Sequence, residues 1–248
     1  MKVKDILSFL SCRFPLETAC DFDNVGLLVG DENSEIKNVL VALDCTAETV
    51  IEAEGKGCNL IVTHHPVIFE GVKNILAGSV PYTCVEKGIS VISMHTNLDI
   101  AKGGVSETLC KALGLSDIVP FEAENGFVLW QGKADNITAQ CFAGLIKEKL
   151  GGVVRYTDSK KPISRVLVCS GSGGEFVFCA AYNGFDAFVS AEIKHHQLLA
   201  ANDLSLCAFD AGHFNSEDII VEPLKELLQK EFAGTVFYTF HSNAIKTL

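Results

Sequence analysis

The sequence contains no apolar run that approaches the roughly 18 residues needed to cross a bilayer as a helix. Its N-terminus also lacks the features of a secretory signal peptide. Asp5, Ser8 and Ser11 interrupt the apolar core, and no small-residue cleavage motif follows. We therefore expect a cytoplasmic protein without a membrane segment. The 248 residues, 48% of them hydrophobic, suffice for a sizeable core in one large or two small domains.

Paired cysteine motifs are also absent, because none of the ten cysteines belongs to a CxxC pair. Several cysteines lie inside apolar runs, for example Cys169 in VLVCS and Cys179 in VFCAA. In a chain of this length, that distribution indicates buried reduced thiols. It argues against a disulfide framework and against a zinc site with sulfur ligands.

Positive charge is scarce: 20 lysines and arginines face 31 aspartates and glutamates, which gives a formal net charge of −11. The average field of such a protein repels a phosphate backbone. Nucleic acid is therefore an unlikely partner, although a bound metal would add local positive charge. The charge favours a small molecule or another protein as the partner.

Short apolar runs of strand length alternate with helical patterns along the chain. The expected strands are 37–44, 59–63, 89–94, 164–170, 186–191, 204–210 and 235–240. The expected helices are 46–57, 80–88, 104–115, 137–150, 174–184, 193–203 and 216–232, the first with Thr46 as its N-cap. The alternation predicts an α/β fold with two α/β lobes and mostly parallel sheets. We place the lobes at 1–120 and 121–248, together forming one compact unit.

Metal-binding residue types follow three of these strands, at the end where open α/β sheets bind ligands. They are His64 and His65 after 59–63, His95 and Asp99 after 89–94, and His213 and Glu217 after 204–210. Four of the seven histidines in the chain are in this set. One histidine in such a place is commonly a loop or core residue, but the clustering indicates a site.

Imidazoles together with carboxylates are typical ligands of zinc, iron, manganese, nickel or cobalt. The set exceeds what one tetrahedral zinc needs and suits two metals about 3.5–4 Å apart. Pro66 disfavours a helical conformation at His65 and keeps that ligand extended. His213 and Glu217 share a helix face if a helix begins at or before His213, and they bracket its first turn if it begins at Ser216.

Six motifs occur in the order found in a known family. They are DFDNVGLLVG (21–30), THHP (63–66), HTNLDIAKGGV (95–105), VCSGSGG (168–174), SAEIKHH (190–196) and GHFNSE (212–217). Over nearly its whole length the chain resembles the GTP cyclohydrolase 1 type 2 homologs, also called the NIF-three-like dinuclear-metal family. The sequence has no room for the inserted domain of longer members, so it resembles the short form.

The resemblance implies two α/β lobes with a dinuclear metal site in the cleft between them, and assembly into a toroidal homohexamer. The metal ligands it implies are His64, His65, Asp99, His213 and Glu217. It places His95, Glu192 and Thr96 close by, as groups that support the ligands or face the substrate. The chain departs from the family pattern beside the site, with Phe22 in place of tryptophan, Ala191 in place of glycine, and Phe214 and Asn215 where GHYETE is common.

Two further motifs have alternative interpretations. GSGG (171–174) follows a strand, and it forms either a tight turn or an anion contact through Gly171 and Gly173. His195 and His196 lie in a helical pattern, where neighbours point about 100° apart, so we expect a helix surface rather than two ligands.

A third motif, DNVGLLVG (23–30), is either a turn into a short strand or a loop that lines the site through Asp23 and Asn24.

The functional hypothesis is a metal-dependent hydrolase that uses two divalent ions (zinc, iron or manganese) on a nucleotide-like substrate. Such ions lower the pKa of water towards neutrality, and His95 or Glu192 could carry a proton. The family label implies attack at C8 of the guanine ring of GTP with loss of formate, while phosphoester cleavage suits such a site equally. The alternative is a non-enzymatic metal-binding scaffold, metal chaperone or regulatory protein.

Overall fold

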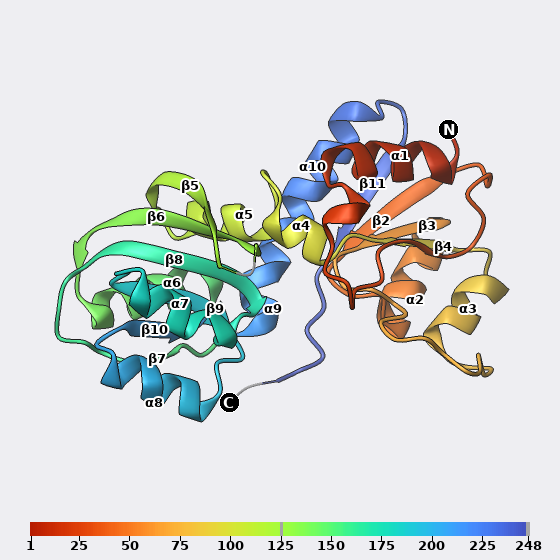
Figure 1. The fold of residues 1–248 in the computed structure, drawn as a ribbon. Helices are drawn as coiled ribbons and strands as arrows, with labels where there is room; N and C mark the ends of the chain where they lie inside the picture. The colour runs from red at the N-terminus through yellow and green to blue at the C-terminus, as the bar shows by residue number, and fades with distance from the viewer. Residues whose placement is uncertain (125, 247–248) are drawn as a thin grey trace. The chain divides into compact units, whose positions relative to one another are not determined.

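The computed structural model describes residues 1–124 and 126–246, which group into two compact units (Figure 1). The first unit comprises Met1–Leu98 and Ile220–Ala244, and the second is built mainly from Asp99–Ile219. The sequence led us to expect a single boundary near residue 120. The grouping differs because the C-terminal part of the chain returns to the first unit and adds a strand to its sheet.

The first unit contains a five-stranded sheet in the order β1-β4-β3-β2-β11. Its strands are β1 (Gly26–Val29), β2 (Asn38–Ala42), β3 (Leu60–Thr63), β4 (Ser90–Ser93) and β11 (Val236–Phe240). Only β1 runs antiparallel to its neighbour. The predicted parallel βαβ arrangement is therefore confirmed in this unit. Thr46 caps the helix after β2 as expected, accepting a hydrogen bond from the Thr49 N–H at 3.2 Å.

Helices cover both faces of this sheet. They are α1 (Val3–Arg13) and α10 (Val221–Glu231) on one face, and α2 (Ala47–Gly55) and α3 (Val80–Glu86) on the other (Figure 1). The sequence analysis did not predict α1, although Val3, Ile6 and Leu10 are fully buried at helical spacing.

The second unit contains a six-stranded sheet in the order β5-β6-β8-β9-β10-β7. Its strands are β5 (Ser116–Glu122), β6 (Val128–Ile137), β7 (Arg155–Tyr156), β8 (Ile163–Ser172), β9 (Ala187–Ala191) and β10 (Cys207–Asp210). Parallel pairing joins β8, β9 and β10, while the outer strands pair antiparallel. The predicted α/β class with two sheets is confirmed, and the second sheet is mixed.

Alternating residues of the parallel strands in the second unit fill two hydrophobic cores. Val166 and Val168 face a core with α5 (Val105–Ala112) and α6 (Ala139–Leu150). Leu167, between them, faces a core with α7 (Val177–Tyr182) and α8 (His195–Asp203). This period of two is the burial pattern of a sheet covered on both faces.

The single long helix predicted at 216–232 is wrong. The structure divides this stretch into α9 (His213–Glu217), the 3-10 turn η3 (Asp218–Ile220) and α10. Pro223 therefore lies in the first turn of α10, where a missing N–H breaks no intrahelical bond. Short helical elements that were not predicted are η1 (Leu16–Thr18), α4 (Thr96–Ile100) and η2 (Gly174–Phe176), the last within an expected helix.

Two expectations from composition can be compared with the described residues. Among the described residues, no helix is both long enough and apolar enough to cross a membrane. All ten cysteines are free thiols in the structure.

Phe142→Ala tests the core beneath α6. Phe142 is fully buried and meets Phe209 edge-on, with ring centroids 5.1 Å apart. We expect a loss of about 3–5 kcal/mol in the free energy of unfolding, measured with urea. Phe178→Ala is the matched control: this ring is 46% exposed, so its loss should cost within about 0.5 kcal/mol. Equal losses in both variants would contradict the core assignment.

Candidate metal site

The register of the first sheet brings three functional side chains to one edge. Ala42, Thr63 and Ser93 are aligned across the parallel strands β2, β3 and β4. Two residues beyond these strand ends the chain reaches Asp44, His65 and His95 respectively. Because parallel strands end at the same edge of a sheet, residues at equal distances beyond aligned positions come close together.

Backbone hydrogen bonds hold these strand extensions in place. The His65 N–H donates to the Leu43 carbonyl at 3.0 Å, and the Met94 N–H donates to the Thr63 carbonyl at 3.0 Å. The Thr63 and Ser93 hydroxyls both donate to the His65 carbonyl, at 2.8 and 3.2 Å. Hydrogen bonds therefore hold both the N–H and the carbonyl of His65, the residue directly before Pro66.

His64 and His65 are each oriented through Nδ1. His64 Nδ1 lies 2.9 Å from the Met94 carbonyl oxygen, and His65 Nδ1 lies 2.7 Å from Asp44 Oδ1. A carbonyl and a carboxylate can only accept, so in each ring the Nδ1 carries the proton. The neutral imidazole then has its lone pair on Nε2.

His95 is oriented in the same way by a buried carboxylate. Its Nδ1 lies 2.8 Å from Asp23 Oδ1, and the Asp23 side chain is fully buried. Asp23 Oδ2 accepts from the Thr96 hydroxyl at 2.5 Å and from the Thr96 N–H at 3.0 Å. Burial alone would raise the pKa of Asp23, but the hydrogen bonds from His95 and Thr96 outweigh it and hold this pKa well below its usual range. Asp23 is therefore a carboxylate that fixes His95.

Thr96 was expected either to support the ligands or to face the substrate, and its contacts in the structure are those of the first role. Its hydroxyl donates to Asp23 and accepts from the Cys20 N–H at 2.9 Å. The residue is only 8% exposed. Its contacts are thus those of a residue that positions Asp23.

The three imidazoles form a compact donor group within the first unit. His64, His65 and His95 can each offer one ring nitrogen, and these three atoms lie within 4.8 Å of one another. The ring centroids are 4.9, 5.2 and 5.6 Å apart. Imidazole nitrogen suits zinc, iron, manganese, nickel or cobalt better than calcium or magnesium. The residues present therefore fit a divalent metal ion of this kind.

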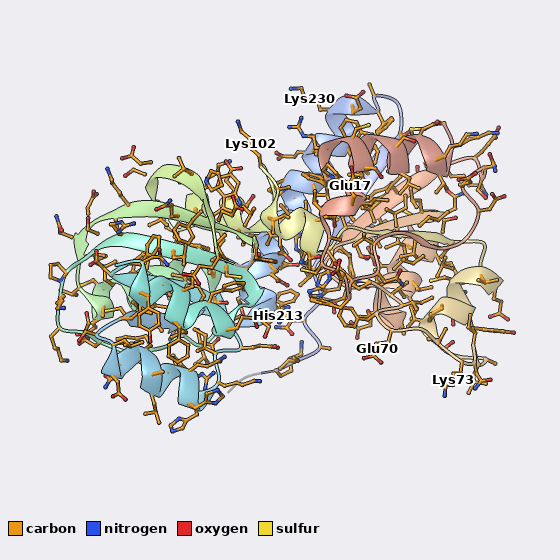
Figure 2. The ribbon with its side chains drawn as sticks, viewed as in Figure 1. Glu17, Glu70, Lys73, Lys102, His213 and Lys230 are labelled. Atoms are coloured by element: carbon orange, nitrogen blue, oxygen red, sulfur yellow. The ribbon has the colours of Figure 1, made fainter. Side chains whose placement is uncertain are left out.

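The second unit arranges His213 between two carboxylates. Helix α9 begins at His213, which Figure 2 labels, so His213 and Glu217 share one helix face. His213 Nε2 lies 3.0 Å from Glu217 Oε2, and its Nδ1 lies 3.1 Å from Glu192 Oε1. Glu192 occupies a left-handed backbone conformation (φ +53°), which costs about 1–3 kcal/mol and directs its side chain here.

Glu217 and Asp99 are the other two carboxylates among the second unit's candidate residues, and Glu217 is the buried one. Glu217 is 1% exposed and packs against the backbone at Gly171. Asp99 Oδ1 accepts from the Ser170 hydroxyl at 2.5 Å, and the Ser170 N–H donates to Ser106 Oγ at 3.0 Å. Both carboxylates are therefore held in defined positions by their neighbours.

The remaining candidate residues have contacts or positions that indicate structural roles. The Gly173 N–H donates to Ser190 Oγ at 2.9 Å, which favours the tight-turn interpretation of GSGG over an anion contact. His195 and His196 are exposed on α8, as the helix-surface interpretation predicted.

Of the residues that orient the candidate ligands, the sequence analysis raised Asp23 as a site-lining alternative and missed the others. Asp44 had a detectable signal, because it is the last residue of the predicted strand 37–44, close to the strand end that the histidines follow in their own strands. Ser106 and Ser170 had none, since a serine in an apolar run commonly satisfies only local backbone groups.

Together the two sheets and the imidazole group define an α/β protein with a candidate metal site at its strand ends. The family model Duf34/NIF3 (NGG1p interacting factor 3) matches residues 1–246, and the chain belongs to this family. A Clostridium perfringens protein named GTP cyclohydrolase 1 type 2 homolog is 32% identical over 98% of this chain and 97% of its own length.

Solved structures of relatives share the fold. The crystal structure of a Staphylococcus aureus hypothetical protein is 30% identical with a TM-score of 0.92, covering 100% of this chain and 99% of that one. Reduced HcgD from Methanocaldococcus jannaschii is 27% identical with a TM-score of 0.83, covering 96% and 97%.

Gly171→Ala tests how closely Glu217 approaches the backbone. Gly171 has φ +62°, and a Cβ there would lie 2.5 Å from Glu217 Oε1. Gly114→Ala is the control, because Gly114 has φ +70° but nothing within 4 Å of the added carbon. The control should lose about 1–2 kcal/mol of unfolding free energy from backbone strain. Gly171→Ala should lose about 1–3 kcal/mol more. Equal losses would show that Glu217 does not occupy this position.

Proposed function

We propose that this protein is a metal-dependent hydrolase that holds two divalent metal ions (zinc, iron or manganese) and acts on a nucleotide-like small molecule. The proposed metal ligands are His64, His65, Asp99, His213 and Glu217. The proposal combines the family membership of the chain with the donor groups that each unit presents.

The observation that carries the proposal is the orientation of the imidazoles through Nδ1. Metal-binding histidines almost always donate the proton of their second ring nitrogen to a carboxylate, a carbonyl or water. His64 and His65 both do so in this structure, to the Met94 carbonyl and to Asp44. In each neutral ring the lone pair then lies on Nε2, the atom that would bind the proposed ion.

The proposed chemistry divides between the ions and the protein. Divalent ions supply Lewis acidity and lower the pKa of water towards neutrality. The side chain of Glu192 is 58% exposed and lies 3.1 Å from His213 Nδ1, so its carboxylate can accept a proton and return it to a leaving group. His95 is the second candidate for this proton transfer, at Nε2.

The nucleotide-like substrate rests on the name carried by the curated relatives, GTP cyclohydrolase 1 type 2 homolog. For this chain, that name would place the reaction at C8 of a guanine ring with release of formate. Phosphoester cleavage is the second reaction that a two-metal site suits. The net charge of −11 means that an anionic nucleotide would depend on the bound cations for its attraction to the site.

Metal content and turnover test this function together. We expect about two metal ions per chain by elemental analysis of protein purified without chelator, and metal-dependent hydrolysis of GTP or a phosphoester. Asp99→Ala should abolish turnover and lower the metal content, because it removes one proposed ligand. Asp135→Ala removes an exposed aspartate and serves as the control.

A parent protein that binds two ions yet hydrolyses neither GTP nor a phosphoester would favour a scaffold or metal chaperone. A parent protein that binds no metal after anaerobic reconstitution would contradict the proposal.

We also propose assembly into a homohexamer in the cytoplasm. Ile51 on α2 and Val85 on α3 are 66% and 64% exposed, on helices that contact each other. Contiguous exposed apolar patches mark interfaces, and in the proposed assembly these two side chains would belong to one. Light scattering should give the mass of six chains, and Val85→Glu should shift the protein to smaller species. A monomeric parent protein would contradict this assembly.

A further inference from the structure

Two phenylalanines beside the imidazole group expose their rings to solvent. Phe22 is 67% exposed and Phe69 is 46% exposed. Their ring centroids are 6.2 Å apart, and the Phe69 ring meets His95 edge-on with centroids 5.9 Å apart. The two rings therefore lead from the imidazoles to the surface of the first unit, with Phe22 as the more exposed ring. The chemistry proposed above uses neither of them.

Helix spacing does not explain this pair. In the second unit, Phe178 and Tyr182 have the same ring separation of 6.2 Å, but they lie four residues apart on α7 and are neighbours by helix geometry. Phe22 and Phe69 belong to two separate loops of the first unit. Their contact is therefore a product of the tertiary fold, and the helical pair provides a matched comparison.

Each loop is held in place directly beside its phenylalanine. Phe22 is followed by Asp23, whose carboxylate is hydrogen-bonded through both oxygens. Phe69 is preceded by Ile68, which packs against a hydrophobic core of the first unit. The Asn24 side chain joins the two loops by donating to the Ile68 carbonyl at 2.6 Å. The exposed rings thus project from fixed backbone, so little conformational freedom would be lost when a ligand packs on them.

The ring spacing identifies Phe22 as the face that a ligand can use. Aromatic rings in contact have centroids about 4.5–7 Å apart. At 6.2 Å the two phenyl rings contact each other, and a third ring does not fit between them. Phe69 has Phe22 and His95 as ring neighbours, whereas Phe22 is mostly open to solvent. The outer face of Phe22 is therefore the surface on which a planar ring can stack.

The charges around the pair distinguish the base of a nucleotide from its phosphate. Asp21 precedes Phe22, Glu70 (labelled in Figure 2) follows Phe69, and both carboxylates are exposed. Carboxylates repel a phosphate group but not a neutral base. The divalent ions proposed for the imidazole group would attract the phosphate instead. A nucleotide would therefore place its base on Phe22 and its phosphate towards the ions.

We propose that Phe22 is the stacking surface for the base of a nucleotide substrate, and that Phe69 and Asn24 position it. The proposal rests on the function proposed above and deepens it, because it assigns a substrate contact and an orientation. With the phosphate towards the ions, this orientation suits phosphoester cleavage better than attack at C8 of the base. Every base has an aromatic face, so stacking recognises a base without selecting which one.

Binding of GMP and of ribose 5-phosphate to the full chain tests the proposal, because the two ligands differ by the base. The protein is first reconstituted with zinc, iron or manganese, and it should bind GMP more tightly. Phe22→Ala should weaken GMP binding about 5–150-fold, the range typical of one lost base stack, and leave ribose 5-phosphate binding unchanged. Phe22→Trp should retain GMP binding, because an indole also stacks. Phe178→Ala, in the helical pair, is the control and should bind GMP as the parent does.

A second measurement keeps an aromatic ring at this position, in case Phe22→Ala does not fold. Phe22→Trp adds an indole to a chain whose single tryptophan, Trp130, is buried in the second unit. GMP should quench the fluorescence of Phe22→Trp beyond any change in the parent protein, and ribose 5-phosphate should not.

The outcomes separate this proposal from the proposed function. Equal affinity of the parent for GMP and ribose 5-phosphate, unchanged GMP affinity in a folded Phe22→Ala, or absence of quenching would overturn the stacking surface and leave the metal-dependent hydrolase intact. A changed mass of the assembly in Phe22→Ala with unchanged GMP affinity would assign the pair to an interface between copies and also overturn it. A parent protein that binds no divalent ion would overturn both.

Discussion

A hydrogen bond to Nδ1 of each imidazole is the interaction on which the candidate site depends. The three acceptors differ in kind: the Met94 carbonyl for His64, the partly exposed Asp44 for His65, and the buried Asp23 for His95. Each leaves the lone pair of the neutral ring on Nε2. Without these bonds the rings could rotate or change tautomer, and three donors at one sheet edge would not amount to a prepared metal site.

The elements of the fold could be predicted where local pattern decides them, but their grouping could not. Apolar runs such as NLIVT become buried strands, and Thr46 caps its helix, because neighbouring residues determine both. The pairing of β11 with β2 joins positions nearly 200 residues apart, and no local signal encodes it. The break at Asp218–Ile220 also escaped prediction, since apolar periodicity continues through it.

The candidate site was predictable in its donors and not in their supports. His64, His65 and His95 follow strands, and parallel strands bring such residues to one edge. Their anchors include a backbone carbonyl, which carries no residue-type signal, and Asp23, whose contact with His95 spans 72 positions. For Thr96 and Gly173 the sequence left a substrate contact and a structural role open, and only the fold shows that their polar groups bond to Asp23 and Ser190.

The tautomers of the three rings in the metal-free protein are the most direct test of this arrangement. Two-dimensional ¹H–¹⁵N NMR of histidine-labelled protein near neutral pH distinguishes a proton on Nδ1 from a proton on Nε2, and His64→Ala, His65→Ala and His95→Ala assign the rings. We predict that all three rings carry the proton on Nδ1, as the acceptors at 2.7–2.9 Å require. Protonation at Nε2 in these rings would contradict the prepared site.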